Sequence, residues 1–548
     1  MTREERFVIV ASSTGTIFEW YDFYLYAVLA PFFAALFFPP GNDTAALLSA
    51  FATYAAGFLI RPFGALLFGR IGDLVGRKYT FLVTILVMGA STFAVGLLPS
   101  FASIGWTAPI LLVSLRLLQG LALGGEYGGA ATYVAEHSRP GDRGYSTSWI
   151  QTTATLGLFM ALGVIGICRS TIEPKAFTEW GWRLPFLVSA ILLAFSVWIR
   201  LKLNETPIFQ KMKAEGKGSS RPLTESFLQY PNNKYVLLAL LGATAGQGVV
   251  WYTGQFYALF FLTITLKVDY LTAYTLIGIS LLIGTPFFIF FGWLSDKIGR
   301  LKIILAGCLI ASLTYFPLFG ALTHYVNPAL EAAQNKTPIS VAASDCNFHI
   351  FVGPWSKFTD CDKAKDFLTK SGISFTSTDL PAGSTDKVIT KIGDTELKGF
   401  DPKVYGEALK AAGFPPNANP DQVNWVMAEL ILVIMVLYVT MVYGPIAAYL
   451  VELFPANIRY TSMSLPYHIG NGWFGGLLPA TSFAIVAQTG DLYSGLWYPI
   501  IIAVMTIIIG LIFVPETKDR DIFAGDASLH PGDKTIVLDP TLPDRTAG

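Results

Sequence analysis

The sequence predicts an all-α membrane protein with twelve transmembrane helices in two pseudo-symmetric six-helix halves, and with a small extracytoplasmic α+β insert. Three observations carry this prediction: apolar residues come in long blocks, short loops alternate in charge, and the two parts of the chain repeat the same features. Of the 548 residues, 53% are hydrophobic and 14% are charged, whereas soluble domains carry about 25% charged residues. Helices buried inside a large soluble protein would be shorter and would carry polar stripes.

Twelve apolar blocks follow one another along the chain, and each is long enough to cross a hydrocarbon core of roughly 30 Å as a helix. The first block lacks a small-residue cleavage site and continues into folded protein, so we expect a retained helix rather than a signal peptide. The blocks fall near 7–36, 44–68, 79–99, 107–135, 146–168, 183–203, 235–262, 271–293, 301–322, 424–451, 460–487 and 493–515.

The short loops alternate between basic and nearly uncharged. "GRIGDLVGRKY" (69–79) and "SDKIGRLK" (295–302) carry several Arg and Lys residues, whereas "FFPPGNDTAA" (37–46) and "LPSFASIGW" (98–106) carry none. The positive-inside rule therefore predicts that the basic loops and both termini are cytoplasmic. Long loops are exempt from this rule, so the lysines of a long outer segment would not contradict it.

Three landmarks recur in the same order in both parts of the chain, which predicts the two-half architecture of a transporter. They are a G-x3-D-x2-G-R pattern, a Glu and an Arg seven positions apart, and a Glu-Thr pair at the end of a half. We expect the landmark charges to form bridges that hold an inner gate closed; solvated loop charges are the alternative. The residues are Asp73 and Arg77 with Asp296 and Arg300, Glu136 and Arg143 with Glu452 and Arg459, and Glu205 with Glu516.

The landmark offsets are 223, 316 and 311 positions, so about 90 residues are inserted between helices nine and ten. This insert is polar, and its strand-like "FHIFV" (348–352) and "ISFTS" (373–377) flank a helix-like run at 362–372, with a second helix expected at 401–416. We therefore expect a small folded cap on the outer face. The expected organisation is an N-terminal half at 1–203, a cytoplasmic linker at 204–234, helices seven to nine at 235–322, the insert at 323–424, helices ten to twelve at 425–520 and a cytoplasmic tail at 521–548.

Two of the four cysteines, Cys346 and Cys361, lie in the insert, whereas Cys168 and Cys308 lie at or inside membrane helices. Disulfides persist on an oxidising outer face, so we expect a bridge between the two insert cysteines; two free thiols are the alternative. A bridge that closes a loop of about 15 residues would stabilise the cap by roughly 3 kcal/mol.

Five stretches carry a resemblance to a known family: "EWYDF" (19–23), "IRPFGALLFGRIGDLVGRK" (60–78), "RLLQGLALGGEYGGAATYVAEHS" (116–138), "WGWRLPF" (180–186) and "YGPIAAYLVELFPANIRYTSMSL" (443–465). Together they resemble the major facilitator superfamily and, within it, the metabolite:proton symporter family. That family includes carriers for 2-oxoglutarate, shikimate, citrate, aromatic acids, and proline or betaine. The resemblance implies the fold and proton coupling, but it does not imply the substrate. The long insert departs from the family, and the tail lacks the heptads of its osmosensing carriers.

Five charged residues stand inside the apolar blocks of the N-terminal half: Glu19, Asp22, Arg61, Arg116 and Glu126. A charge at the centre of a bilayer is costly, so such a residue is functional by default. At about 1.5 Å per helical residue, Glu19, Arg61 and Glu126 fall in one layer, and the other two lie higher.

Three acids against two bases leave one carboxylate without a cation, and such a group can hold a proton near neutral pH. We therefore expect proton coupling at Asp22, Glu19 and Glu126, with Asp22 as the lone carboxylate at the midplane. The alternative is that Arg61–Glu126 and Arg116–Asp22 are buried pairs that only hold helices together.

The substrate site is expected between the halves. Arg61 and Arg116 can bind a carboxylate, and Gln247, Trp251 and Gln255 repeat at i, i+4 and i+8, which predicts one polar stripe facing a cavity. The expected substrate contacts are Arg116, Arg61, Gln119, Tyr127, Gln151, Gln247, Trp251, Gln255, His468 and Asn471. For His468, a satisfied core histidine is the alternative.

The sequence therefore predicts a proton-coupled importer of a small organic acid, working by alternating access as a monomer in the inner or plasma membrane. One alternative is uptake of a zwitterion such as proline or betaine, for which Trp251 and Trp473 could supply cation–π contacts. Another is a membrane sensor whose insert binds the ligand. The zero net charge argues against a nucleic-acid partner. No enzyme, cofactor or metal-binding pattern is present in the sequence.

Overall fold

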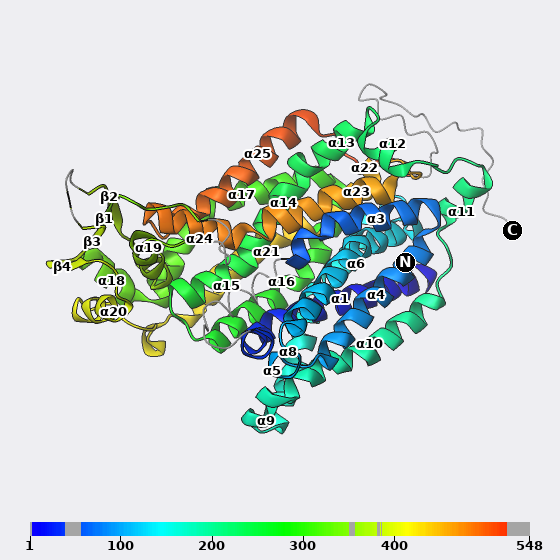
Figure 1. Cartoon of the computed structure of the whole chain (residues 1–548). Helices are drawn as coiled ribbons and strands as arrows, with labels where there is room; N and C mark the ends of the chain where they lie inside the picture. Colours follow the sequence, from blue (N-terminus) through cyan, green and yellow to red (C-terminus); the bar gives the residue numbers. More distant parts are fainter. Residues whose placement is uncertain (1–2, 39–55, 350–356, 381–383, 385, 523–548) are drawn as a thin grey trace.

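The structure is a computed structural model that describes residues 3–38, 56–349, 357–380, 384 and 386–522. Long helices of the N-terminal half, blue to cyan, lie beside those of the C-terminal half, green to red (Figure 1). Among the described residues, nine helical segments are long and apolar enough to cross a membrane. The chain is thus an all-α membrane protein with a small insert, as the sequence predicted.

The N-terminal half is built from long helices joined by short turns. The predicted second span begins in residues outside the described part of the chain, and its described end contains α3. The helices are α1 (Arg3–Phe37), α3 (Arg61–Leu74), α4 (Arg77–Leu97), α5 (Phe101–Ile104), α6 (Thr107–His137), α7 (Arg143–Gln151), α8 (Thr153–Thr171), α9 (Pro174–Glu179) and α10 (Leu184–Leu201).

Among the described residues, the C-terminal half differs from the first half in having π-helical turns, which widen a helix locally and are frequent at functional sites. The linker carries α11 (Pro207–Ala214) and α12 (Pro222–Phe227). The next elements are α13 (Asn232–Ala239), η2 (Leu240–Thr244), α14 (Ala245–Tyr252), η3 (Thr253–Tyr257), α15 (Ala258–Phe260), η4 (Phe261–Thr265), α16 (Tyr270–Ile298) and α17 (Arg300–Val326), and after the insert α21 (Trp425–Tyr443), α22 (Ile446–Leu453), α23 (Arg459–His468), η6 (Ile469–Gly475), α24 (Leu478–Thr489) and α25 (Trp497–Phe513).

The repeat found in the sequence is also a structural repeat. In the first half the Glu205 carboxylate accepts the backbone N–H of Arg77, the first residue of α4, at 3.2 Å. In the second half Glu516 accepts the backbone N–H of Arg300, the first residue of α17, at 2.8 Å. A carboxylate at a helix N-terminus accepts hydrogen bonds from free N–H groups and interacts favourably with the helix dipole. The same helix-capping contact therefore occurs in both halves.

The insert folds into a four-stranded sheet with the order β2-β1-β3-β4. β1 and β2 are parallel, whereas β1 with β3 and β3 with β4 are antiparallel. Alternate residues of β1 and β3 are buried, which is the pattern of a sheet with one face on a core. The elements are α18 (Pro328–Lys336), β1 (Ile339–Ala343), α19 (Asp360–Lys370), β2 (Thr376–Thr378), β3 (Val388–Ile392), β4 (Thr395–Lys398) and α20 (Pro402–Ala411). We call this module the cap.

The expectations for the insert are largely confirmed. The two predicted helices correspond to α19 and α20, and the predicted strand at 373–377 overlaps β2. Residues 348 and 349 of the other predicted strand are not in a strand, and its residues 350–352 lie outside the described part. The predicted disulfide between Cys346 and Cys361 is present, with the two Cα atoms 5.2 Å apart.

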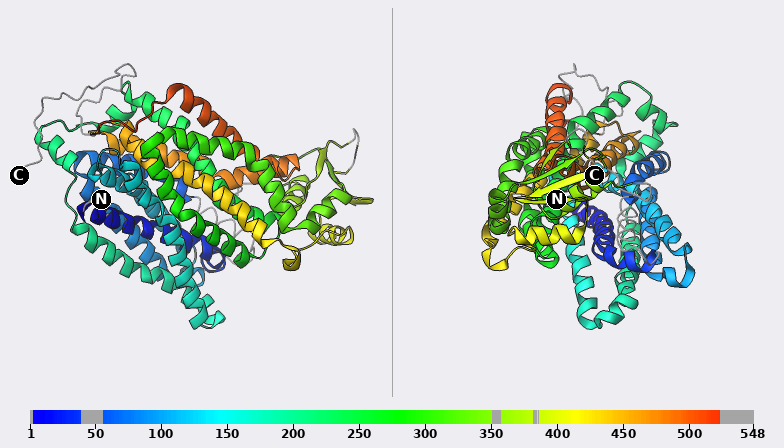
Figure 2. Two further views of the ribbon diagram at one scale, coloured as in Figure 1. Left: turned by 180° about the vertical axis from the view of Figure 1, so that it is seen from behind. Right: turned by 60° about the vertical axis from the view of Figure 1, so that its left-hand side comes forward.

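The cap is fastened to the C-terminal half, at the end of the bundle opposite α11 and α12 (Figure 1, Figure 2). The backbone N–H of Phe375 donates to the Gly490 carbonyl at 2.8 Å, where α24 ends. The Lys267 ammonium, just after η4, donates to the carbonyl of Lys370 at the end of α19. The cap and the C-terminal helices therefore form one continuous piece.

Replacing both bridge cysteines, Cys346→Ser with Cys361→Ser, is expected to lower the free energy of unfolding of the cap by about 3 kcal/mol, because the bridge spans 15 positions and limits the unfolded chain. Urea-dependent limited proteolysis of the cap in the purified full-length protein measures this. The matched control is Cys168→Ala with Cys308→Ala, which removes two thiols outside the cap. Equal protease resistance of the two variants would contradict the expectation.

Candidate functional site

Glu19 lies inside the bundle on α1. Its side chain is 7% exposed, and it forms no hydrogen bond or ion pair with any residue that the structure describes. Four charged side chains act on it: Arg61 and Arg200 attract the carboxylate, and Glu126 and Asp22 repel it. Glu19 is therefore a buried acid that remains available for a proton or a ligand.

Asp22, one helical turn further along α1, is fully buried and fully partnered. Arg116 donates to it at 3.2 Å, the Thr92 hydroxyl at 2.9 Å and the Gln119 amide at 3.0 Å. The expected Arg116–Asp22 pair is present. Asp22 is not the lone carboxylate that the sequence predicted, and Gln119 belongs to this pair.

Glu126 on α6 binds Arg200 of α10, so the Arg61–Glu126 pair that was considered as an alternative is not formed. The Arg200 guanidinium donates to both carboxylate oxygens, and the Thr84 hydroxyl donates at 2.7 Å. The sequence-based count omitted Arg200, which interrupts the sixth apolar block near its end. With Arg200 added to the five charged residues predicted for the interior of the N-terminal half, three acids face three bases.

Arg61, the first residue of α3, belongs to neither the Asp22–Arg116 pair nor the Glu126–Arg200 pair. Its guanidinium lies 4.5 Å from the centre of the Phe58 ring, its side chain is 8% exposed, and it forms no ion pair with a described residue. Tyr252, on α14 of the other half, is within electrostatic range of both Arg61 and Glu19. Arg61 and Glu19 thus form an oppositely charged set beside the interface of the halves.

Three tyrosines close the interior between the two halves. Tyr127 on α6 stacks on Tyr467 of α23, with ring centroids 3.7 Å apart and ring planes 4° apart. The hydroxyls of Tyr443 and Tyr467 are hydrogen-bonded at 2.8 Å, and the Gln151 amide donates to the Tyr127 hydroxyl at 2.8 Å. Glu19 is within electrostatic range of all three rings. Tyr443 and Tyr467 were missed by the sequence-based prediction, because an aromatic residue in an apolar block is usually packing.

The predicted polar stripe on helix seven is interrupted. The π-helical turn η3 follows α14, so the i, i+4, i+8 spacing does not continue to Gln255. Gln247 exchanges two hydrogen bonds of 2.9 Å with Asn471 of η6, whereas Gln255 lines a separate small cavity. Only Gln247 and Asn471 of this group are brought together.

The remaining candidates of the C-terminal half divide between the interior and the surface. Trp251 on α14 is buried against Trp20 of α1, with ring centroids 5.2 Å apart, so it joins the two halves. His468 on α23 is buried within electrostatic range of Arg61. Trp473 is 38% exposed, so the structure does not place it with this group.

The repeated landmarks meet at the end of the bundle opposite the cap, which we call the landmark end. Asp73 pairs with Arg77 at 2.8 Å, as expected, and it also accepts the backbone N–H groups of Tyr460 and Thr461 from α23 at 3.3 and 2.8 Å. An acid of the first half therefore caps a helix of the second half.

The second half makes the equivalent contact with the first half through Asp296. Asp296 pairs with Arg300 at 2.5 Å and accepts the backbone N–H groups of Gly144 and Tyr145 from α7 at 2.9 and 2.8 Å. Two pseudo-symmetric helix-capping contacts, made by Asp73 and Asp296, therefore join the halves.

The second landmark forms ion pairs between the halves instead of within them. Glu136 binds Arg459 at 2.8 Å, and Glu452 binds Arg143 at 3.6 Å. The two Glu–Arg landmarks, Glu136 with Arg143 and Glu452 with Arg459, thus exchange partners between the halves. Glu452 also binds Arg300 at 2.9 Å. The landmark end is closed by reciprocal bonds.

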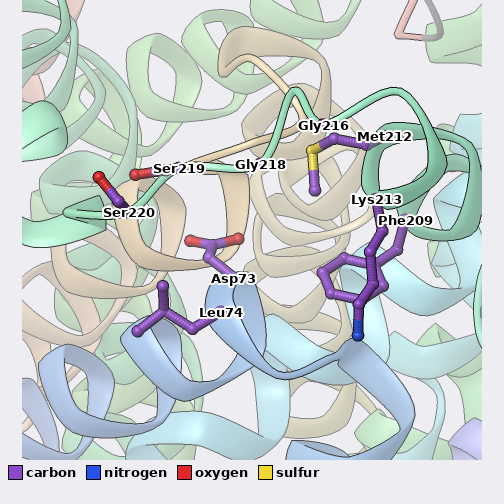
Figure 3. Close-up of a pocket in the computed structure, with 9 residues that line it drawn as sticks. All are labelled: Asp73, Leu74, Phe209, Met212, Lys213, Gly216, Gly218, Ser219 and Ser220. Carbon is purple, nitrogen blue, oxygen red and sulfur yellow. The ribbon is translucent and has the colours of Figure 1, made fainter.

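The linker covers part of this closure. A cavity of ≈ 270 Å³ is lined by Asp73 and Leu74 of α3 and by linker residues from Phe209 to Ser220, and Figure 3 shows the linker passing over the end of α3. The closure at Asp73 is thus bordered by a space beneath the linker.

In the described part of the N-terminal half, the interior of the bundle offers one acid, Glu19, and one cation, Arg61, that are available to a ligand. The bundle is closed at the landmark end. Bonds that join two halves at one end can break if the halves rotate, and an interior ligand could then leave. The described residues that sequence reasoning missed are Arg200, Tyr443, Tyr467 and Trp20.

Comparisons with known proteins agree with this architecture. Residues 12–328 match the family model described as the Major Facilitator Superfamily, and residues 411–527 match the one described as sugar (and other) transporter. The alpha-ketoglutarate permease of Escherichia coli is 36% identical, over 60% of this chain and 74% of the relative. The proline/betaine transporter of Salmonella typhimurium is 34% identical, over 57% of this chain and 64% of the relative.

A solved structure has the same fold. The proton:xylose symporter XylE superposes with a TM-score of 0.62 over 95% of this chain and 98% of XylE, at 14% identity. At that identity the likeness concerns the fold alone. The family match covers more than half of the chain, and the permease match covers most of that relative. This chain therefore belongs to the Major Facilitator Superfamily and is a multi-pass membrane transporter of metabolites.

Proposed function

We propose that this chain is a proton-coupled symporter that imports a small organic acid by alternating access. It acts as a monomer in the inner membrane, with the landmark end in the cytoplasm and the cap outside. The observation that carries the proposal is the pair formed by Glu19 and Arg61. Both are buried in the bundle, lie within electrostatic range of each other and have no ion partner among the described residues.

Each member of this pair has a separate task. Arg61 offers a planar guanidinium that can bind a carboxylate with two hydrogen bonds. Glu19 then has to share its cation with the incoming anion, and taking up a proton removes the repulsion between the two carboxylates. Substrate and proton are therefore bound together, and the site regains charge balance only when both are present.

The closed landmark end supports alternating access. The pairs Glu136–Arg459 and Glu452–Arg143 hold the cytoplasmic side shut. Because one partner of each pair lies in each half, rocking of the halves separates both pairs at once. Release into the cytoplasm follows that separation.

A zwitterion is the second candidate. The stacked tyrosines and the Trp20–Trp251 contact line the junction of the halves with aromatic faces, and such faces bind quaternary ammonium groups. The proline/betaine relative is consistent with this candidate, and the alpha-ketoglutarate permease is consistent with an acid. A sensor without transport is the third candidate, and substrate uptake into vesicles separates it from the other two.

Glu19→Gln is expected to abolish accumulation of substrate under an imposed pH gradient, because the amide cannot carry the proton. Exchange of labelled for unlabelled substrate, which needs no net proton movement, should persist. Proteoliposome uptake and counterflow measure the two processes. Glu126→Gln is the matched control: it disturbs the Arg200 pair, so its expected effect is a loss of stability. A Glu19→Gln protein that still concentrates substrate would remove Glu19 from the coupling role.

Arg61→Gln is expected to weaken the binding of an anionic substrate by about 10- to 150-fold, the equivalent of about 1.5–3 kcal/mol for a hydrogen bond to a charged group. Thermal-shift titration with organic acids and with betaine measures this. Arg116→Gln combined with Asp22→Asn is the control, because it removes both members of a buried pair and leaves Arg61 in place. Unchanged affinity for acids in Arg61→Gln, with tight betaine binding, would favour the zwitterion.

Asp73→Asn is expected to lower the maximal transport rate several-fold with little change in substrate affinity. The reason is that it weakens the contact of Asp73 with the N-terminus of α23 and leaves the interior charges unchanged. Asp296→Asn should act in the same way, since Asp296 makes the mirrored contact on α7. Asp142→Asn is the exposed control, because this side chain caps no helix N–H group. Transport kinetics and substrate binding are measured in parallel, and equal losses of rate and affinity would contradict a gating role.

A further inference from the structure

The cap places both of its cysteines at the edge where its parallel strands end. Cys346 follows three positions after the end of β1, and Cys361 is the second residue of α19, which connects β1 to the parallel strand β2. In open sheets, ligands bind outside the carboxyl ends of parallel strands. Cysteine pairs beside a βαβ unit are typical of thioredoxin-like redox centres, which space them C-x-x-C; here they are 15 positions apart.

The two cysteines of the bridge differ in exposure. Cys361 is fully buried, whereas Cys346 is half-buried. Cys346 is therefore the residue of the bridge that an external thiolate can approach in the folded cap. Because exchange is a direct attack on one sulfur with departure of the other, this difference sets the direction of the reaction: Cys346 is attacked, and Cys361 leaves.

The leaving sulfur lies in an environment that can hold negative charge. The first turn of a helix has backbone N–H groups without intrahelical partners, and the Thr359 hydroxyl accepts only that of Asp362. Lys365 stands one turn after Cys361, on the same face of α19. It is 5% exposed and forms no hydrogen bond or ion pair with a described residue. Burial lowers the pKa of Lys365, and the charges of Asp362 and Asp379 oppose that shift.

Other charges surround the same turn. Asp345, Asp360 and Asp362 lie near this turn in the chain and would oppose a thiolate at Cys361. The His349 ring lies 3.0 Å from the Asp362 carboxylate. Burial raises the pKa of Asp362, but hydrogen bonds from Asn347, Thr359 and His349 outweigh burial and keep it below its ordinary value. Lys365 is thus the buried cation that faces this acidic turn.

We propose that the Cys346–Cys361 disulfide is a thiol–disulfide exchange centre for external thiols. An external thiolate attacks the Cys346 sulfur and forms a mixed disulfide, and the electron pair of the broken S–S bond leaves on Cys361. A second external thiolate then attacks the external sulfur of the mixed disulfide and releases Cys346. Two electrons pass from the external thiols to the cap, the external thiols become a disulfide, and their two protons go to the two cysteines. The thiols can be small molecules or a protein dithiol, and the exchange does not depend on transport.

The first experiment tests whether the bridge reacts in the folded protein. The full-length protein carries Cys168→Ala and Cys308→Ala, so that only the two cap cysteines remain. It is incubated in detergent with glutathione or with a reduced C-x-x-C protein, quenched with acid, denatured and alkylated with a mass-tagged maleimide. Reduction without added denaturant is expected, and the faster reagent identifies the source of the thiols. A bridge that both reagents leave intact until the cap unfolds would overturn the proposal.

The second experiment tests the direction of attack. Cys361→Ser leaves only Cys346, and Cys346→Ser leaves only Cys361, each in the same background. Oxidised glutathione is expected to form a mixed disulfide with Cys346 at least about tenfold faster than with the buried Cys361, since access controls the rate. Equal rates, or faster reaction at Cys361, would overturn the assignment.

The third experiment tests Lys365. Lys365→Met keeps the length of the side chain and removes its charge, and Lys363→Met removes an exposed charge of the same helix as the control. Losing one opposite charge raises a thiol pKa by about one unit, which slows departure of the Cys361 thiolate by about threefold at a sensitivity of about 0.5. A reduction rate that falls only in Lys365→Met supports the role, and equal rates in the two variants would overturn it. Circular dichroism of both variants verifies that the cap is folded.

Discussion

A charge inside a membrane must be paired or must take part in binding, because the low dielectric offers no other compensation. Two acids of the interior satisfy this constraint completely: Asp22 with Arg116 and Glu126 with Arg200. These pairs join helices within the N-terminal half and hold it as a unit. Within the described part of the N-terminal half, the constraint is left open at Glu19 and Arg61. The proposed function places a substrate and a proton there.

Internal repetition determines how the halves meet at the landmark end. Each half carries the same glutamate and the same arginine. The glutamate of the first half can therefore bind the arginine of the second, and the glutamate of the second half can bind the arginine of the first. Glu136–Arg459 and Glu452–Arg143 are such a reciprocal set, as in a two-fold symmetric interface. The closure is therefore built from matched contacts, and a rotation of one half affects both together.

The sequence predicted the membrane class, the paired halves and the folded cap, because long apolar blocks, matched landmarks and turn residues are local features. It did not predict which charges pair. Arg200 lies near the end of an apolar block, where an arginine usually extends to the interface, and only the packing of α10 against α6 brings it to Glu126. The exchange of the landmark partners likewise depends on how the halves pack. The spacing of Gln247 and Gln255 failed because a π-helical turn adds a residue to the helix, which periodicity alone does not reveal.

The position of the cap restricts how the protein can move. Its described hydrogen bonds to the bundle end on the C-terminal half, among them Phe375 to Gly490 and Lys267 to Lys370. If the halves rock as proposed, the cap travels with the C-terminal half, and the end of the bundle near the cap opens between that half and the N-terminal half. α19 contacts η4 and α24, its last residue, Lys370, accepts a hydrogen bond from Lys267, and Cys361 of the disulfide is its second residue. The proposed exchange at the disulfide and the proposed transport therefore share one rigid element, and the disulfide lies at the other end of α19 from the Lys267 contact.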